Sequence, residues 1–389
     1  MSAVLRPSSM ARAIEPTMIR SLRAKMGSST IDFGLGQTDL EVTQAVARHL
    51  RRSMSASIYA PYTPNAGLFR ARQAVADHVG CDPKEVMLTC GVQQGLAVSL
   101  LGLCESGDEV LVPDPGFPAY INLVRAAGAT PIRYPLRSPT REEPGWGLEP
   151  QELLSRVTNR TRLVLFNNPS NPTGSVHDAE DLGEVIEELG RREVGWISDE
   201  IYEDYVWEGE FSSARSFDDR GVVLSGLSKS HHMMGWRLGW MVAPRETIAA
   251  LTPLHQHLVT CAPRPAQEAA IAALESHREA MKGTREIFTE RRRQVLQALK
   301  SVPVGSAPVA QGAFYLFVDA RPWMDTFSTT VALAEKLLEE EDVLVIPGEG
   351  FGPAGLGHLR IAYTIGGESL DLGLRRLCGF LKRHANHGE

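Results

Sequence analysis

The stretch Ser225-Gly-Leu-Ser-Lys-Ser-His-His-Met-Met-Gly-Trp-Arg-Leu-Gly-Trp240 decides the fold of this 389-residue chain. Apolar runs at residues 221–224 and 238–243 flank its single lysine, and each has the length of a buried strand. An amine between buried strands loses hydration, which lowers the pKa of Lys229 and frees the amine to attack a carbonyl carbon. Arg237 offers a bidentate guanidinium that suits a phosphate. A surface turn with an unrelated ion pair would also explain Lys229 taken alone.

Taken whole, the string S-G-L-S-K-S-x-x-M-x-G-W-R-L-G-W resembles the Schiff-base segment of fold-type I aminotransferases, which use pyridoxal 5′-phosphate. It is similar to the class I/II branch that holds the prokaryotic aspartate and alanine aminotransferases. The string is specific because it fixes residues of different chemistry at set spacings. His231 and His232 stand where that branch often has an aromatic and a small residue. This departure leaves the cofactor chemistry unchanged and the substrate open.

Composition predicts a soluble, cytoplasmic protein of two domains. Apolar residues make up 43% and charged residues 22% of the chain, and a net charge of −7 argues against a nucleic-acid surface. The opening residues lack a signal-peptide core, and no apolar stretch approaches a membrane span. The five cysteines are scattered, without a C-x-x-C pair or the spacing of zinc ligands. We therefore expect free thiols in a reducing compartment and no metal site.

The order of apolar runs predicts an α/β fold. Short strands and helices alternate from about residue 86 to residue 243, which favours a mostly parallel central sheet with helices on both faces. Polar residues follow the strands, at the edge where such sheets bind ligands. The resemblance implies an aspartate aminotransferase-like large domain at residues 45–265. A smaller α/β domain would combine the N-terminal segment 1–44 with residues 266–389. Helices are expected at about 246–257 and 266–299.

Two segments predict a phosphate site. Residues 86–95 read as a strand, a glycine break and a helix, whose free N–H groups and positive dipole end suit an anion. The resemblance places the cofactor phosphate on the amides of Gly91, Val92 and Gln93, with Ser228 and Arg237 beside them. The loop Y-T-P-x-A-G at residues 62–67 is similar to a family loop that serves the neighbouring subunit. By that resemblance Tyr62 reaches the partner's phosphate, so a homodimer with shared active sites is expected.

Four further residues are expected around the cofactor ring. Prolines hold Phe117 at a strand end, where the resemblance stacks it on the ring, although Phe117 could also be core. The signature N-P-S-N-P-T-G assigns Asn171 to the phenolic oxygen. Asp199 ends a buried strand, where an acid needs a cation such as a protonated ring nitrogen. The spacing D-E-x-Y brings Tyr202 to the phenolic oxygen. Asp199 could instead cap the next helix.

The family resemblance assigns the substrate contacts to residues near both ends of the chain. The loop at residues 31–40 would close over the substrate, with the backbone of Gly36 near its carboxylate and Thr38 where the family often has proline. The string L-R-I makes Arg360 the bidentate partner of the substrate α-carboxylate, with Asn171 also at the substrate. A buried structural ion pair would serve Arg360 equally well. Arg264 could reach the mouth of the site, although a surface role fits it too.

The resemblance implies ping-pong transamination from an L-amino acid to a 2-oxo acid through a Lys229 Schiff base. Lys229, Asp199 and Tyr202 are the catalytic residues, with Lys229 as general base and acid. Another reaction on the same scaffold stays open: a C–S lyase or β-eliminase, or an oxidase or cyclase. A Ser-Lys acyl enzyme is excluded because Gly226 interrupts S-x-x-K. The 31–40 loop lacks the third glycine of a dinucleotide-binding fingerprint, which argues against a dehydrogenase. About 30 residues precede this loop, too few for the DNA-binding domain of a transcription regulator. The amino donor is not readable.

Overall fold

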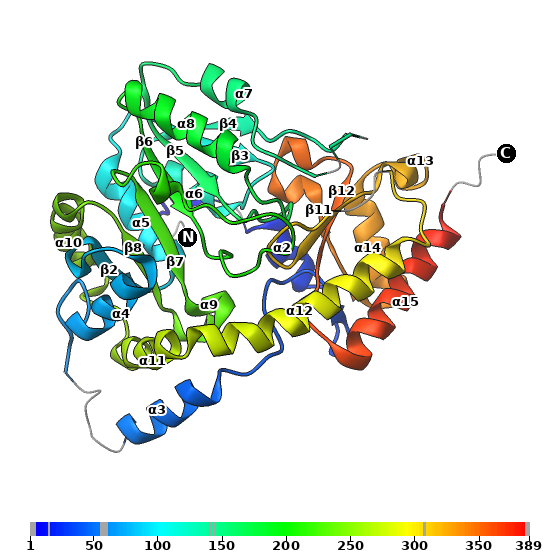
Figure 1. Cartoon of the computed structure of the whole chain (residues 1–389). Helices are drawn as coiled ribbons and strands as arrows, with labels where there is room; N and C mark the ends of the chain where they lie inside the picture. Colours follow the sequence, from blue (N-terminus) through cyan, green and yellow to red (C-terminus); the bar gives the residue numbers. More distant parts are fainter. Residues whose placement is uncertain are drawn as a thin grey trace.

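The computed structural model describes residues 5–14, 16–54, 61–140, 142–143, 145–305 and 309–385 (Figure 1). The α-helices are α1 Ser9–Ala13, α2 Met18–Arg23, α3 Gln44–Met54, α4 Phe69–Val79, α5 Val92–Leu103, α6 Ala119–Ala126, α7 Pro150–Ser155, α8 Ala179–Arg191, α9 Leu227–Ser230, α10 Arg245–Val259, α11 Arg264–Glu275, α12 His277–Leu299, α13 Met324–Phe327, α14 Thr330–Glu341 and α15 Gly367–Arg383. Short 3-10 turns are η1 Pro83–Glu85, η2 Ala214–Ser216, η3 Met234–Trp236, η4 Arg321–Trp323, η5 Gly348–Phe351 and η6 Pro353–Gly355.

A seven-stranded sheet forms the centre, in the order β2-β8-β7-β6-β5-β3-β4. Its strands are β2 Val86–Thr89, β3 Glu109–Asp114, β4 Thr130–Pro135, β5 Thr161–Asn167, β6 Gly195–Asp199, β7 Val222–Gly226 and β8 Gly239–Val242. Strand β8 runs antiparallel to both of its neighbours, and the other pairs are parallel. The prediction of a mostly parallel sheet is therefore confirmed.

Alternate residues of each strand enter different apolar clusters, because successive side chains of a strand point to opposite faces. In β5, Val164 packs in one cluster with Val185 of α8. Leu163 packs in another, with Leu96 of α5. Helices α4, α8 and α11 contribute to the first cluster, and α5, α6 and α10 to the second. Both faces of the sheet are thus buried under helices, which explains why its strands are apolar without alternation.

A smaller α/β unit combines both ends of the chain (Figure 1). Strand β1, Ile31–Asp32, pairs in parallel with β10, Val343–Leu344. Strands β11 Ile346–Pro347, β12 His358–Ala362 and β9 Tyr315–Asp319 form an antiparallel sheet in that order. Residues of α12, α14 and α15 pack with these strands in a third apolar cluster. The backbone N–H of Phe33 donates to the carbonyl oxygen of Leu344, so the N-terminal segment is held by the C-terminal one.

The prediction of one continuous helix at residues 266–299 is wrong, because Ser276 separates two helices, α11 and α12. The Ser276 hydroxyl donates to the carbonyl oxygen of Ala272, and its backbone leaves the helical region at φ −106° and ψ 10°. A serine that bonds its own backbone competes with helix formation.

The helices in the described part of the chain are too short or too polar to span a lipid bilayer. Among the described residues, no three metal-ligating side chains gather in one place.

Strands β7 and β8 approach each other and α5 through glycine backbones. A Cβ atom on Gly239 would lie 2.7 Å from the backbone nitrogen of Val92 and 2.8 Å from the carbonyl carbon of Gly91. On Gly226 it would lie 2.8 Å from the Cα atom of Gly239. Backbone atoms in a sheet cannot move aside as a flexible side chain can. These two glycines therefore set how close the start of α5 comes to the sheet.

We expect Gly239→Ala to destabilise the protein by about 1–3 kcal/mol, because the added methyl group overlaps the start of α5. The midpoint of urea unfolding, followed by circular dichroism, measures this loss. Gly235→Ala is the matched control, since a Cβ there meets no atom within 4 Å, and its effect should stay within about 0.5 kcal/mol. Equal midpoints for the two variants would contradict the close packing of these backbones.

Candidate active site

A cavity of about 390 Å³ opens beside the carboxyl ends of β5, β6 and β7 and reaches β12 of the smaller unit. Most of the predicted site residues line it: Gly36, Val92, Gln93, Phe117, Asn171, Asp199, Tyr202, Ser228, Lys229, Arg237 and Arg360. Gly91 caps α5 at its edge. Tyr62 does not line it, and its side chain is 82% exposed. The structure therefore brings together residues from both ends of the chain around Lys229.

Lys229 lies in the short helix α9, directly after β7, and its amine donates to the carbonyl oxygen of Gly36 at 2.7 Å. Burial, together with the positive charge of Arg360, lowers the pKa of Lys229 to about 8, although the negative charge of Asp199 opposes this shift. An ordinary lysine titrates more than two units higher. The amine is thus neutral in about a tenth of the molecules at pH 7, far more than for an ordinary lysine, and the neutral form is the one that acts as a nucleophile or a general base.

Asp199 ends β6 and is 6% exposed. The hydroxyl of Tyr120 donates to its Oδ2 at 3.0 Å, and the backbone N–H of Ile201 to its Oδ1 at 3.3 Å. Burial raises the pKa of Asp199 to about 6, against these hydrogen bonds and the charge of Lys229. A turn follows Asp199 rather than a helix, so a helix cap does not explain it. No described cation lies within ion-pair distance of this carboxylate.

Arg360 is buried on β12. Its guanidinium donates to Oδ1 of Asn171 at 2.7 Å and to the carbonyl oxygen of Gly34, and lies 4.5 Å from the ring centre of Tyr315. No described carboxylate pairs with it, and its Nε atom has no hydrogen-bond partner among the described residues. The alternative of a structural ion pair therefore fails for the described part of the chain. A buried guanidinium at a cavity wall can accept an external carboxylate.

The start of α5 and Arg237 form the opposite end of the cavity. Gly91 has φ +81°, a conformation that favours glycine, and a Cβ there would lie 2.5 Å from the guanidinium of Arg237. Val92 and Gln93 begin the helix, so their N–H groups have no partner within it. Within the described ranges, Arg237 donates only to carbonyl oxygens, those of Met234 and Cys90. Free amides beside an exposed guanidinium make a site for an anion.

Three side chains that the sequence analysis missed support this cavity. The hydroxyl of Tyr120 donates to Asp199. Tyr120 could have been predicted to lie at the site, because it stands three residues after Phe117, a spacing that places two side chains on the same face of a helical turn, and both line the cavity. Asn167 accepts from the backbone N–H of Asn171. The hydroxyl of Tyr315 lies 2.9 Å from that of Tyr202. Tyr315 comes from the smaller unit, and no local pattern marked it.

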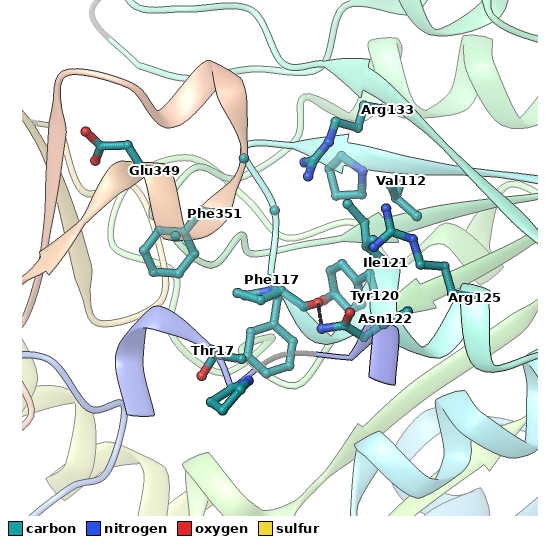
Figure 2. Close-up of a pocket in the computed structure, with 17 residues that line it drawn as sticks. Thr17, Val112, Phe117, Tyr120, Ile121, Asn122, Arg125, Arg133, Glu349 and Phe351 are labelled. Carbon is teal, nitrogen blue, oxygen red and sulfur yellow. Dashed lines mark hydrogen bonds between the residues drawn. The ribbon is translucent and has the colours of Figure 1, made fainter. Parts of the chain in front are cut away.

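A second hollow of about 400 Å³ lies on the other side of Phe117, which contacts Tyr120 edge to face (Figure 2). It shares Thr17, Phe117 and Tyr120 with the cavity. Figure 2 shows Arg125 and Arg133 on one side of it and Glu349 on the other. Phe117 therefore lies between two adjoining hollows, and it also packs against the apolar cluster that α5 and α6 share.

The remaining candidates lie away from the cavity. Arg264 begins α11, and its guanidinium approaches the carbonyl oxygen of Pro61 at 3.5 Å and Glu268 at 3.9 Å. His231 is fully buried, and its Nε2 lies 3.1 Å from the carbonyl oxygen of Ala273. His232 is also buried and does not line the cavity.

Comparison with known proteins agrees with this geometry. A model of the family described as aminotransferase class I and II matches residues 28–377. The aspartate aminotransferase of Pyrococcus horikoshii is 32% identical over 378 residues, which cover 94% of each chain. The aromatic-amino-acid aminotransferase 2 of Thermococcus litoralis is 30% identical over 384 residues, covering 95% of this chain and 96% of its own.

A solved structure supports the same assignment. A single mutant of Thermus thermophilus aspartate aminotransferase superposes with a TM-score of 0.89 at 29% identity, covering 97% of this chain and 100% of that one. The predicted aspartate aminotransferase-like fold is confirmed. Because the family match spans most of the chain and the fold is shared end to end, this protein belongs to the class I and II aminotransferases and is a transaminase that depends on pyridoxal 5′-phosphate.

Proposed function

We propose that this enzyme moves an amino group from an L-amino acid to a 2-oxo acid in two half-reactions, with Lys229 as the residue that bonds to the cofactor and transfers the proton. One observation carries the proposal. The cavity holds an amine with a pKa of about 8, a buried carboxylate and a buried guanidinium, and none of the three has an ion pair among the described residues. Such groups need external partners of opposite charge.

The cavity fits pyridoxal 5′-phosphate. The amides of Gly91, Val92 and Gln93, the hydroxyl of Ser228 and the guanidinium of Arg237 would hold the phosphate. Phe117, Asn171, Asp199 and Tyr202 would surround the ring. When bound, the cofactor supplies an aldehyde for a Schiff base and a ring that accepts electrons.

Asp199 would hold a proton on the ring nitrogen. Its carboxyl group titrates near pH 6, so it is largely ionised at neutral pH, and Tyr120 and Ile201 fix the direction of its two oxygens. A fixed negative charge in a buried site favours a positive partner without having to reorient. Tyr202 would donate to the phenolic oxygen on the other edge of the ring.

Lys229 would act as general base and general acid. Its neutral amine can take a proton from the Cα atom of the substrate, and its protonated form can return one. Arg360 would orient the substrate by binding its α-carboxylate with two parallel hydrogen bonds, beside the backbone of Gly36. Asn171 and the ring of Tyr315 hold the guanidinium for this contact.

We also propose that the substrate side chain extends past Phe117 into the second hollow. Arg125 lines that hollow, and no described carboxylate pairs with it. Arg133 lies 3.8 Å from Asp114, so its charge is partly matched. An acidic side chain would suit Arg125, and the relative from Pyrococcus horikoshii is named an aspartate aminotransferase.

A homodimer with shared sites is the proposed assembly, in the cytoplasm. Tyr62 and Phe69 are 82% and 60% exposed, and a partner subunit seated on this loop and the start of α4 would bury both. Asn65 donates to the carbonyl oxygen of Thr260, so the Tyr62 loop lies against the start of the segment that leads into α11.

The five free cysteines support a reducing compartment. We retain residues 45–265 as the large domain, because β2 to β8 lie within that range.

The reaction is tested by a half-reaction screen of amino acids against the purified enzyme, followed by the shift in cofactor absorbance. We expect the acidic amino acids to react faster than aromatic ones, and Lys229→Ala to lose the bound-cofactor absorbance and at least about 10³-fold of the turnover. Lys282→Ala, an exposed lysine of α12, should behave as wild type. Keto-acid formation that continues without any acceptor would contradict transamination and indicate the lyase or oxidase alternative.

The pKa of Lys229 can be measured in the cofactor-free protein by competitive acetylation at different pH values. Reactivity should rise as the amine loses its proton and level off above a midpoint near pH 8. Arg360→Gln removes a repelling positive charge and should move the midpoint to higher pH, whereas Arg360→Lys keeps the charge and should not. A wild-type midpoint near the ordinary lysine value of about 10.4 would contradict the burial of this amine.

If the active sites are shared between subunits, two inactive variants should regain catalytic activity when they form a hybrid dimer. In a hybrid of Lys229→Ala and Tyr62→Ala, one of the two sites has an intact Lys229 and an intact Tyr62 from its partner. A random equal mixture should regain about a quarter of the wild-type activity. Lys229→Ala mixed with Asp199→Asn is the control and should regain none, because both residues serve the same site. A monomer in sedimentation, or no regain with Tyr62→Ala, would contradict the shared site.

A further inference from the structure

His232 joins two segments that are far apart in the chain. Its Nδ1 atom lies 3.2 Å from the hydroxyl of Thr38, and its Nε2 atom 3.2 Å from the hydroxyl of Thr284 on α12. The ring is 8% exposed, and the residue follows α9, three positions after Lys229. The imidazole therefore connects the 35–39 loop, next to the lysine helix, with α12.

The backbone of His232 supports a specific role. Its φ is +58°, in the left-handed region that residues other than glycine adopt uncommonly, although asparagine, aspartate and histidine do so more often than the rest. Such conformations persist where the surrounding contacts over-determine them, often at functional sites. Here the determining contacts are the two threonine hydroxyls at opposite ends of the ring.

The hydrogen-bond pattern fits a neutral imidazole. The backbone N–H of Leu40 donates to Oγ1 of Thr38 at 2.9 Å, which leaves the hydroxyl proton of Thr38 free to point at Nδ1 of His232. Nε2–H can then donate to Thr284. Burial, with the nearby charge of Arg291, lowers the pKa of His232 to about 4, so the ring stays neutral throughout the physiological range.

The loop that Thr38 belongs to is held from two sides. On the side of the smaller unit, the hydroxyl of Thr364 donates to the carbonyl oxygen of Leu35, and Arg291 pairs with Asp39 at 2.7 Å. On the side of the large sheet, Lys229 contacts the carbonyl oxygen of Gly36 and His232 contacts Thr38. The Lys229 contact is broken whenever that amine reacts. In the part of the chain that the structure describes, His232 then provides the remaining hydrogen bond from residues 225–240 to the loop.

We propose that His232 is a positioning residue for substrate binding: through Thr38 it fixes the backbone of Gly36 at the place where the substrate carboxylate binds. The inference rests on the proposed function for the identity of that substrate. It assigns His232 no contact with the cofactor, because the ring does not line the cavity. Losing the Thr38 hydrogen bond should therefore weaken substrate binding and leave cofactor binding unchanged.

Three substitutions distinguish the hydrogen bonds made at the two ends of the imidazole ring. In His232→Asn the amide takes the place of Nδ1 and keeps the bond to Thr38, and asparagine tolerates positive φ. In His232→Gln the amide takes the place of Nε2 and keeps only the bond to Thr284. His232→Ala keeps neither. We expect KM for the amino acid to rise about 3- to 10-fold in the Ala and Gln variants and to stay near wild type in the Asn variant.

The same three holoenzymes should keep kcat within about 2-fold and show unchanged cofactor absorbance, because only substrate positioning is lost. Thr38→Val removes the bond from its other end together with the acceptor of the Leu40 N–H, so its effect should be smaller in the His232→Ala background than in the wild type. Thr38→Ser is the conservative control and should behave as wild type. These loop variants also test the proposal should His232→Ala fold poorly.

Hydrogen–deuterium exchange of the holoenzyme without substrate gives a readout that needs no turnover. Amides of residues 35–40 should exchange faster in His232→Ala and Thr38→Val than in the wild type and His232→Asn. Wild-type KM and exchange in His232→Ala, or an Asn variant as impaired as the Ala variant, would overturn the proposal. If the wild type failed to transaminate at all, the proposed function would fall, while the exchange result would still decide the role of His232.

Discussion

The burial of charge without counter-charge is the constraint on which this active site depends. Asp199, Lys229 and Arg360 lie around one cavity, and none has an ion pair among the described residues. Removing an ion from water costs several kcal/mol unless a partner restores the interaction. The protein offsets part of this cost with neutral dipoles: Tyr120 and Ile201 hold the carboxylate, and Asn171 holds the guanidinium. The remaining cost appears as shifted pKa values, about 6 for Asp199 and about 8 for Lys229.

Much of the fold and part of the site could be predicted from the sequence, because these features depend on local order. Apolar runs such as residues 163–166 predict buried parallel strands by themselves, and the polar residue that follows each strand must lie at the carboxyl edge of the sheet. Asp199 and Lys229 are both of this kind. The family resemblance then assigned chemistry to positions that strand order had already brought together. Its finer assignments, such as the reach of Tyr62 into a partner, stay predictions.

Features that join distant segments could not be predicted. Tyr202 and Tyr315 meet across 113 residues, and Thr38 and His232 across 194, so no spacing within either segment marks the contact. His231 and His232 were recognisable as unusual, but their partners depend on how α12 and the 35–39 loop pack. The break at Ser276 was missed for the opposite reason. The Ser276 hydroxyl donates to the carbonyl oxygens of Ala272 and Ala273 where α11 ends, within a pattern that otherwise continues as a helix.

The reversed direction of β8 has a consequence for the spacing within the lysine segment. In a parallel sheet a chain that leaves the carboxyl edge must cross to the opposite edge before it enters the next strand. Because β8 runs back beside β7, the chain leaves the carboxyl edge after Gly226 and re-enters the sheet at Gly239 on that same edge. Lys229, proposed to bond to the cofactor, and Arg237, proposed to hold its phosphate, therefore belong to one excursion of the backbone. Its length fixes their separation, so an insertion or deletion there would change the span between aldehyde and phosphate that the enzyme can accommodate.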